Sequence, residues 1–289
     1  MLTIGGMAIV VICVFGGYIL AGGHMAVILK ALPFELMIIG GAAVGSLIIA
    51  NSMQTVKGAV AGVMRVIKGP KWKRQDYQDL LCLLYALANV YKKKGAMGLE
   101  THVEQPHESA IFKTYPKILG DHFACAMVCD TLRMVTLNLE DPHQIDDYID
   151  RLLEKHHGEA MQPAQALQSV ADALPALGIV AAVLGVIKTM GSISEPPEVL
   201  GKMIGGALVG TFLGVFLAYG FVGPLASRLM QVVDEDAQFY AVIKDVLVAM
   251  SHGANPPLAV EIGRGNVPTT VQPSFYDIEK AVESAPSAA

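Results

Sequence analysis

The chain has 289 residues, of which 53% are hydrophobic and 16% charged, and its mean hydropathy is +0.47. These values indicate an integral membrane protein and exclude an ordinary soluble globular protein. The formal net charge is −5 and no long cationic face is present, so nucleic acid is not an expected partner.

Four uncharged apolar runs predict membrane-spanning helices. A helix needs about 20 apolar residues to cross a hydrocarbon core that is roughly 30 Å thick. Residues 4–21, 36–56 and 203–227 have about this length. The fourth run, 173–187, is shorter, so it must be buried among neighbouring helices or extend beyond its charged flanks.

The distribution of Lys and Arg predicts how these helices are oriented. The joints after the first and third helices carry only Lys30, Lys188 and Lys202. All but these three of the 21 basic residues lie in the remaining segments. We therefore expect two helical hairpins in the membrane, with both chain termini and the long middle segment in the cytoplasm.

The middle segment is expected to be a compact bundle of helices. Apolar residues at helical spacing predict an amphipathic helix over 75–91, which ends at the sequence Lys92, Lys93, Lys94, Gly95. Three further helices are expected before the third span: 118–139, 145–158 and 160–173. After the fourth span, helical periodicity continues to residue 250, so one helix is expected to extend out of the membrane.

The predicted fold is therefore an all-α integral membrane protein. Residues 1–56 hold transmembrane helices 1 and 2, and residues 57–170 form a large helical cytoplasmic domain. Residues 171–227 hold transmembrane helices 3 and 4. Residues 228–289 form the extension of the fourth helix and a C-terminal tail.

Small residues recur at helical spacing in the third and fourth spans. Gly206, Gly210 and Gly214 stand at every fourth position of the fourth span, and Gly178 and Gly185 share one face of the third with Ala182. Small residues let two membrane helices approach closely, so we expect these glycines to pack the helices together.

Thr211 is the only Ser, Thr, Asn or Gln between Gly206 and Tyr219 in the fourth span. Its hydroxyl can bond the carbonyl of its own helix, which would make it a packing residue. Alternatively, it lines a narrow and weakly polar path between two helices. Residue types alone leave both interpretations open.

Ionisable residues are expected only at the ends of the spans or outside them. Glu35 and Asp172 adjoin the apolar runs, and His24 lies in an outer loop. Ion paths through membranes almost always use an ionisable side chain. If this chain conducts ions, we therefore expect a partner to supply the carboxylate.

Two prolines have different expected roles. Pro175 is expected at the start of the third span, where the missing N–H has no cost. Pro224 lies within a helix that is expected to continue, so it predicts a kink or hinge there.

No enzyme motif is present: the chain lacks a phosphate-binding glycine loop, a zinc-protease motif and a defensible Ser/His/Asp arrangement. Cys125 and Cys129 are one helical turn apart, but no second pair of ligands accompanies them. We expect no metal, no cofactor and no enzymatic activity.

Longer strings resemble a known family. DALPALGIVAAVLG at 172–185 and VGTFLGVFLAYGFVGPLA at 209–226 closely resemble the MotA stator proteins of the bacterial flagellar motor, within the MotA/TolQ/ExbB family. Shorter matches follow in collinear order over almost the whole chain: 14–18 with 22–23, 79–85, 99–100 and 256–264.

The resemblance implies a subunit in the bacterial inner membrane that converts ion flow into torque. It implies five such chains around two copies of MotB, whose membrane Asp binds the ion, and contact with the rotor switch protein FliG. The implied residues of the ion path and its coupling are Pro175, Ala182, Thr211 and Pro224. Sodium-driven relatives tend to carry Thr where this chain has Ala182, so the proton is the expected ion.

The residues implied at the rotor are Lys92 and Glu100, and Lys93 or Lys94 could share the role of Lys92. At the position of Lys92 the family has Arg. Lysine keeps the positive charge but cannot form the two parallel hydrogen bonds that a guanidinium group makes with a carboxylate. A solvated helix end, with lysines complementing the helix dipole, is the competing interpretation.

Two other functions remain open from the sequence. The chain could be an energy-coupling subunit of the ExbB/TolQ kind, although four spans and the long middle segment favour the motor. It could also be a membrane scaffold that conducts nothing.

Overall fold

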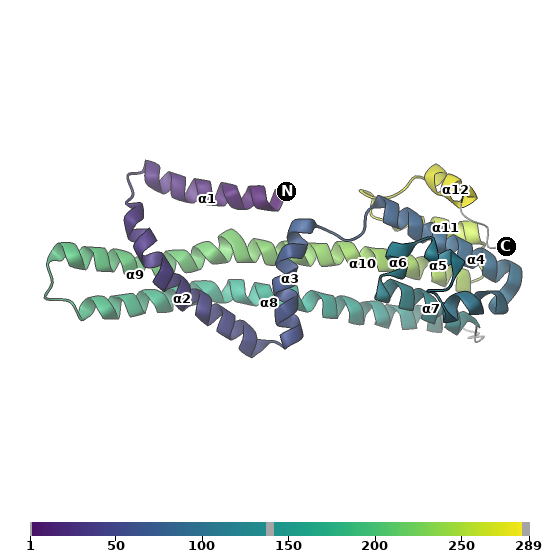
Figure 1. Ribbon diagram of the computed structural model, residues 1–289, viewed down its shortest axis with the longest axis horizontal. Helices are drawn as coiled ribbons and strands as arrows, with labels where there is room; N and C mark the ends of the chain where they lie inside the picture. The colour runs from purple at the N-terminus through teal and green to yellow at the C-terminus, as the bar shows by residue number, and fades with distance from the viewer. Residues whose placement is uncertain (1, 137–141, 285–289) are drawn as a thin grey trace. The chain divides into compact units, whose positions relative to one another are not determined.

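The computed structural model describes residues 2–136 and 142–284, and this part of the chain is helical, without strands (Figure 1). Within it, four helical stretches are long and apolar enough to cross a membrane. They are α1 (Leu2–Leu20), α2 (Met25–Ala50), α8 (Pro142–Met190), and α9 (Pro197–Leu217) continued by η1 (Ala218–Val222) and α10 (Gly223–Ser251). The expected all-α membrane fold is confirmed.

The chain divides into two compact units. The first is formed by Met1–Gly69 and Ala160–Val232, and the second by Pro70–Glu159 and Val233–Ala289. α3 (Met53–Lys68), which we expected in the middle domain, belongs to the first unit. The second unit contains the remaining helices: α4 (Arg74–Glu104), α5 (Ala110–Lys113), α6 (Pro116–Leu119), α7 (His122–Thr136), α11 (Pro256–Gly265) and α12 (Phe275–Ser284).

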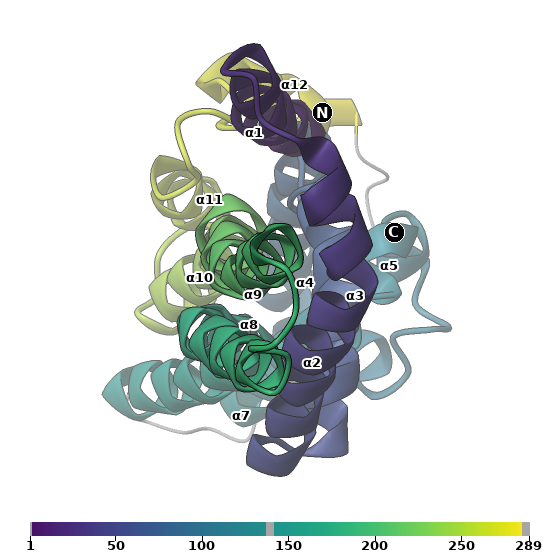
Figure 2. The ribbon, with the colours of Figure 1, turned by 90° about the vertical axis from the view of Figure 1, so that its left-hand side faces the viewer.

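In the first unit, α8 and α9 run side by side in opposite directions, and their backbones touch (Figures 1 and 2). A Cβ atom placed on Gly214 would lie 2.6 Å from the carbonyl oxygen of Leu174 and 2.8 Å from Cα of Gly178. One placed on Gly185 would lie 2.6 Å from Cβ of Ala207. Larger side chains at these glycines would force the two helices apart.

Gly206 differs from the other glycines that we expected to pack helices. A Cβ atom there would meet no atom within 4 Å. Gly206 instead lines a pocket whose other residues come from α2, α8 and α9, although a Cβ atom on Gly185 would meet the next residue, Ala207.

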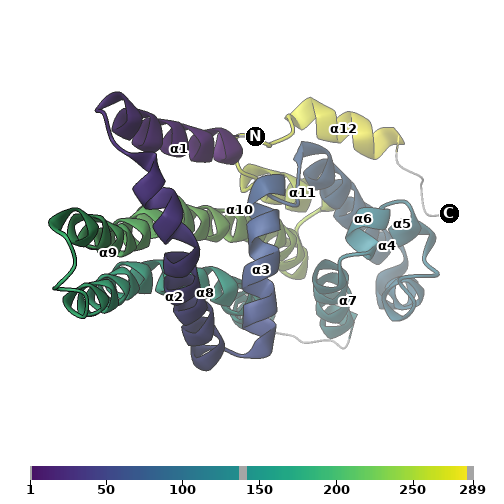
Figure 3. The same cartoon turned by 60° about the vertical axis from the view of Figure 1, so that its left-hand side comes forward.

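α2 lies across α8 and α9 (Figures 1 and 3). Its buried residues are Ile28, Glu35, Ile39 and Ala43, which stand at helical spacing and so form one face. Ile39 and Ala43 pack in an apolar cluster with Leu174 and Ala181 of α8, Leu213 of α9 and Ala218 of η1.

The predicted start of the second span at residue 36 is wrong, because the helix begins at Met25 and ends at Ala50. The uncharged run is interrupted at Lys30 and Glu35, whereas the helix continues through both residues and through Pro33. Consequently Glu35, which we placed at the end of a span, lies in the interior of α2.

α8 also differs from its prediction. The separate helices expected over 145–158, 160–173 and 173–187 are one continuous helix, which includes Pro163 and Pro175. Pro175 is therefore not at a helix start, and it removes one backbone hydrogen bond inside the helix. Membrane helices tolerate such a loss where neighbouring helices enclose the freed group.

The predicted helix 118–139 is interrupted in the structure. Its first residues belong to α6, and α7 begins only at His122. Asp121 stands before α7 and accepts a hydrogen bond from the backbone N–H of Ala124 at 2.7 Å, as an N-cap residue does. The predicted end of this helix lies outside the described residues.

A π-helical turn precedes Pro224. The N–H of Gly223 donates to the carbonyl of Ala218, five residues earlier. Proline cannot donate and its ring crowds the carbonyl four residues before it, so a π turn at this point accommodates Pro224 without ending the helix. The structure has an irregular turn at this point, and the kink expected at Pro224 stays a prediction.

The second unit has an apolar core around α4, which contacts α7, α11 and α12 (Figure 3). Trp72 stacks on Phe239, with ring centroids 3.7 Å apart. Lys71 and Lys117 lie over the Trp72 ring and form ion pairs with Asp121 and Asp76, respectively. The tail predicted after residue 250 thus includes two helices that complete this unit.

Replacing Gly214 with Ala is expected to destabilise the first unit by about 1–3 kcal/mol, since the new methyl group meets backbone atoms of α8. Gly206→Ala adds the same methyl group to the same helix in open space and serves as the matched control. Thermal unfolding of the detergent-solubilised protein measures the difference. Equal melting temperatures for Gly214→Ala and the parent would contradict the inferred backbone contact.

Candidate functional site

The structure brings two of the four expected path residues to the same level of the α8–α9 contact. A Cβ atom on Gly210 would lie 3.1 Å from the backbone nitrogen of Ala182. Thr211 is the next residue on α9 and is half-buried. Ala182 and Thr211 therefore stand on facing helices beside the point where the backbones touch.

The two prolines lie farther along. Pro175 follows Leu174, whose carbonyl oxygen faces Gly214, so it lies about two turns from Ala182. Pro224 is exposed and lies about 20 Å from Thr211 along the helix axis, at a rise of 1.5 Å per residue. The four residues thus follow the helices in series and do not form one cluster.

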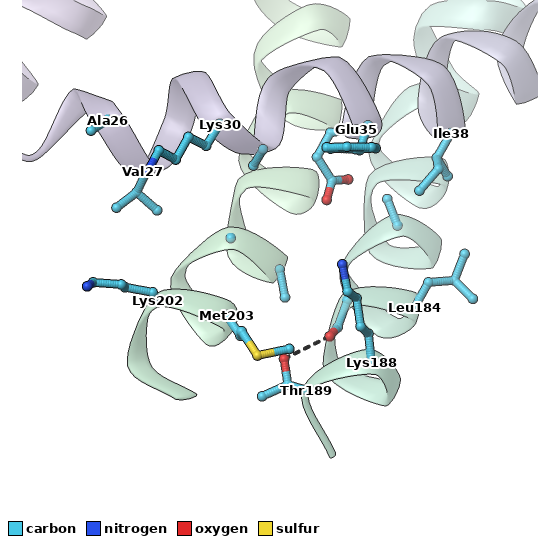
Figure 4. A pocket seen from close by; sticks show the side chains of 16 residues that line it. Ala26, Val27, Lys30, Glu35, Ile38, Leu184, Lys188, Thr189, Lys202 and Met203 are labelled. Carbon is cyan, nitrogen blue, oxygen red and sulfur yellow. Dashed lines mark hydrogen bonds between the residues drawn. The ribbon is translucent and has the colours of Figure 1, made fainter. Parts of the chain in front are cut away.

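A pocket of about 540 Å³ opens between α2, α8 and α9 (Figure 4). Its lining is mostly apolar, but it includes Lys30 of α2, Lys188 and Thr189 of α8, and Lys202 of α9. The hydroxyl of Thr189 donates to the carbonyl of Gly185 at 2.9 Å. Lys30, Lys188 and Lys202, the basic residues expected on the joints after the first and third spans, therefore line one pocket.

Glu35 lines the same pocket, and its carboxyl group points into it (Figure 4). The residue is only 7% exposed, and its Oε2 atom has no hydrogen-bond partner. A Cβ atom on Gly210 would lie 2.7 Å from Oε2, so the glycine leaves the space that the carboxyl group occupies.

Sequence reasoning missed Glu35 as a residue of this site. The available signal was the spacing of Ile28, Glu35, Ile39 and Ala43, which continues one helical face across the charged residues. Lys30 and Glu35 interrupt the uncharged run, so this helical face is not visible when every charged residue is taken as the end of a span.

In the second unit, the residues expected at the rotor lie on α4 and are exposed. Lys92 precedes Gly95 and Glu100 follows it, and Gly95 has a positive φ of 65° that breaks the helix. The ammonium group of Lys92 donates to the side-chain oxygen of Asn255 at 2.9 Å. The structure therefore places the two residues on separate segments of α4, both open to solvent.

His102 links the part of α4 that follows Gly95 to the next helix, α5. Its Nδ1 atom lies 2.7 Å from the hydroxyl oxygen of Ser109, which caps the N-terminus of α5. Burial of the ring, and then the charge of Lys94, lower the pKa of His102 below its usual value of 6.5. The neutral imidazole thus links the segment that carries Glu100 to the rest of the unit.

The buried cysteines of the second unit have the surroundings of structural residues. Burial raises the pKa of Cys82 to about 11, which keeps the thiol protonated and unreactive. Cys125 and Cys129 hydrogen-bond each other. Over residues 2–136 and 142–284, no three His, Cys, Asp or Glu side chains are grouped as metal ligands.

Comparisons with known proteins agree with one another. Residues 4–95 match the family described as "Motility protein A N-terminal", and residues 121–241 match the "MotA/TolQ/ExbB proton channel family". The chain is 39% identical to Motility protein A of Salmonella typhimurium over 284 residues, which covers 98% of this chain and 96% of the relative. The same values hold for Motility protein A of Escherichia coli.

A solved structure has the same fold. The "Structure of C. jejuni MotAB" matches with a TM-score of 0.72 at 20% sequence identity, and the match covers 92% of this chain and 95% of the other. At this identity the likeness establishes the fold alone.

Acidification is expected to destabilise the second unit through His102. Its pKa is lower in the folded than in the unfolded state, so the unfolded state binds more protons as the pH falls below about 6.5. The contribution of His102 to the free energy of unfolding is therefore complete above that pH, and it is lost as the pH falls towards the pKa of the folded state.

Urea unfolding between pH 7.5 and 5, followed by the fluorescence of Trp72, tests this expectation, since Trp72 is the only tryptophan and lies in the core of this unit. His102→Gln is expected to reduce the pH dependence, and His107→Gln, at an exposed position, to leave it unchanged. An identical pH dependence in His102→Gln and the parent would disprove the role of His102.

Proposed function

We propose how this chain works, starting from the fact that it belongs to the motility protein A (MotA) family and is a stator subunit of the bacterial flagellar motor. The observation that carries this conclusion is the 39% identity to two motility proteins over 98% of this chain. Because these full-length relatives are motility proteins, an energy-coupling role of the ExbB/TolQ kind is not favoured. In this function the chain catalyses no chemical reaction.

The four spans of the first unit cross the bacterial inner membrane, and the second unit and both termini lie in the cytoplasm. The exposed large apolar side chains gather mainly on the first unit, which suits contact with lipid or with neighbouring helices. The positive-inside rule supports the orientation, because most basic residues then remain in the cytoplasm.

The chain works in a complex of five copies around two copies of MotB. The described part of α8 exposes a row of apolar side chains along its membrane section, including Ile179, Val183 and Ile187. α9 likewise exposes Leu208 and Val215. These faces provide apolar surface against which further helices can pack. The solved structure of similar fold is a MotAB structure.

The ion is a proton, which passes beside Ala182 and Thr211 and is bound by an acidic side chain of MotB. A desolvated sodium ion needs several oxygen ligands to replace its hydration shell. Beside Gly210, the side chains of Ala181 and Ala182 have no oxygen, and the Oε2 atom of Glu35 is the one side-chain oxygen among the three nearest atoms. A proton requires only an acceptor group or a water molecule.

Ion passage turns the ring of subunits, and the second unit passes the motion to the rotor switch protein FliG. Lys92 and Glu100 are exposed on α4 and can form ion pairs with charged groups of FliG. The π turn before Pro224 and the missing hydrogen bond at Pro175 are the irregular points at which the membrane helices can bend.

Motility driven by this chain is expected to persist when sodium is replaced by potassium and to stop when a protonophore collapses the proton gradient. The reason is that Ala182 has no side-chain oxygen, so the site beside it offers too few oxygen atoms to replace the hydration shell of a sodium ion. Swimming speed of cells with this chain as their only stator subunit is the measurement. Loss of swimming on removal of sodium would refute the choice of ion.

Reversing both rotor charges, Lys92→Glu with Glu100→Lys, is expected to reduce torque strongly while assembly and proton conduction persist. Exposed ion pairs contribute only about 0–1 kcal/mol each, so either single reversal should have a smaller effect. Glu279→Lys with Lys280→Glu makes the same changes at exposed positions of α12 and is the matched control. Undiminished torque in the Lys92/Glu100 double variant would remove these residues from the rotor interface.

A further inference from the structure

Glu35 is a carboxyl group inside a membrane helix, and nothing in the mechanism above uses it. It stands ten residues after the start of α2, which corresponds to about 15 Å along the helix axis. Ionisable side chains are rare at such positions and are retained mainly where they serve transport or binding.

Its surroundings do not account for it as a structural group. A buried polar side chain normally finds a hydrogen-bond partner, because an unpaired one loses its water without compensation. Oε2 of Glu35 is buried without a partner, although Lys188 extends into the same pocket from α8 (Figure 4). A carboxylate that served only to hold α2 in place would be expected to pair with a neighbouring helix.

We propose that Glu35 is a proton-binding residue of this chain, at the inner end of a vestibule formed by α2, α8 and α9. The Glu35 carboxylate accepts a proton from water in the pocket and becomes a neutral carboxylic acid. It then releases the same proton to the next acceptor on the path. This inference rests on the proposed function, in which that acceptor is the carboxylate of the partner.

The pocket connects Glu35 with the outer side of the membrane in the proposed orientation. Its lining residues come from the start of α2, the end of α8 and the start of α9, which are the ends next to the two outer joints. The pocket holds several water molecules by volume, at about 30 Å³ for each water.

The groups that face Glu35 suit a proton better than a metal ion. From α2 the pocket receives Lys30, from α8 Lys188 and Thr189, and from α9 Lys202. Among the residues that line the pocket in the described part of the chain, only Glu35 and Thr189 have a side-chain oxygen, so the pocket lacks the oxygen-rich site that a desolvated sodium ion needs. A proton passes between water molecules and does not need such a site.

Gly210 links the vestibule to the residues expected on the path. The absence of a side chain at Gly210 gives Oε2 of Glu35 its space, and the same position adjoins the backbone of Ala182. Thr211 follows on α9. The carboxyl group thus reaches the level of the α8–α9 contact at which the proposed path passes.

Proton uptake into vesicles that contain the complex of this chain with MotB tests the proposal. Glu35→Gln keeps the size of the side chain and removes its ability to bind and release a proton. We expect it to slow uptake by about tenfold or more, as removal of a positioned proton-transfer group does, and to flatten the dependence on external pH. Glu35→Asp should restore part of the rate.

Glu198→Gln is the matched control, because Glu198 is exposed in the first turn of α9 and does not line the pocket. It should conduct as the parent does. Equal uptake with an equal pH profile in Glu35→Gln and the parent would overturn the proposal, while leaving the stator function intact.

Infrared difference spectroscopy of the purified complex provides a readout that does not depend on conduction. On acidification the parent and Glu198→Gln should gain a carboxylic C=O band that Glu35→Gln lacks. The same band in Glu35→Gln would show that Glu35 does not bind the proton. If the parent conducts no protons, the proposed function fails, and the infrared band still decides whether Glu35 is protonated.

Discussion

The first unit depends on one constraint, the direct contact between the backbones of α8 and α9. In lipid, helices gain little from burying apolar side chains, so close van der Waals contact must hold them together. Gly178, Gly185 and Gly214 permit this contact because each lacks the atom that would collide with the opposite helix. The contact also sets the level at which Ala182 and Thr211 stand on their two helices, and the missing side chain of Gly210 leaves space for the carboxyl group of Glu35.

The second unit is stabilised by different means. Its core consists of large apolar side chains around α4, and the stacked rings of Trp72 and Phe239 lie beneath two lysines that are paired with aspartates. In water, burial of such side chains is itself the driving force. A unit held in this way can present Lys92 and Glu100 on a firm surface, whereas the helices of the first unit keep irregular turns at which they can bend.

Much of the fold could be predicted from the sequence, and the errors have physical causes. Hydropathy found all four spans because a membrane helix requires a long apolar run, and family resemblance supplied the residues that we expect on the ion path and at the rotor. The boundaries of α2 and α8 were wrong because charges and prolines were treated as helix ends. Tertiary packing overrides both signals: Glu35 and Pro175 are accommodated where other helices enclose them. The expected partner carboxylate remains part of the proposal, but this chain also has a carboxyl group of its own inside a span.

The sequence by itself determined the class of protein, the number of spans, the small-residue faces and the family. These properties follow from composition and spacing, which a chain carries whatever its neighbours are. Only the tertiary structure decided that Lys30, Lys188 and Lys202 meet around one pocket and that Glu35 is buried there without a partner. Such groupings join residues from three helices that are far apart in the chain, and their geometry is set by how closely the backbones at Gly210 and Gly214 can approach α8.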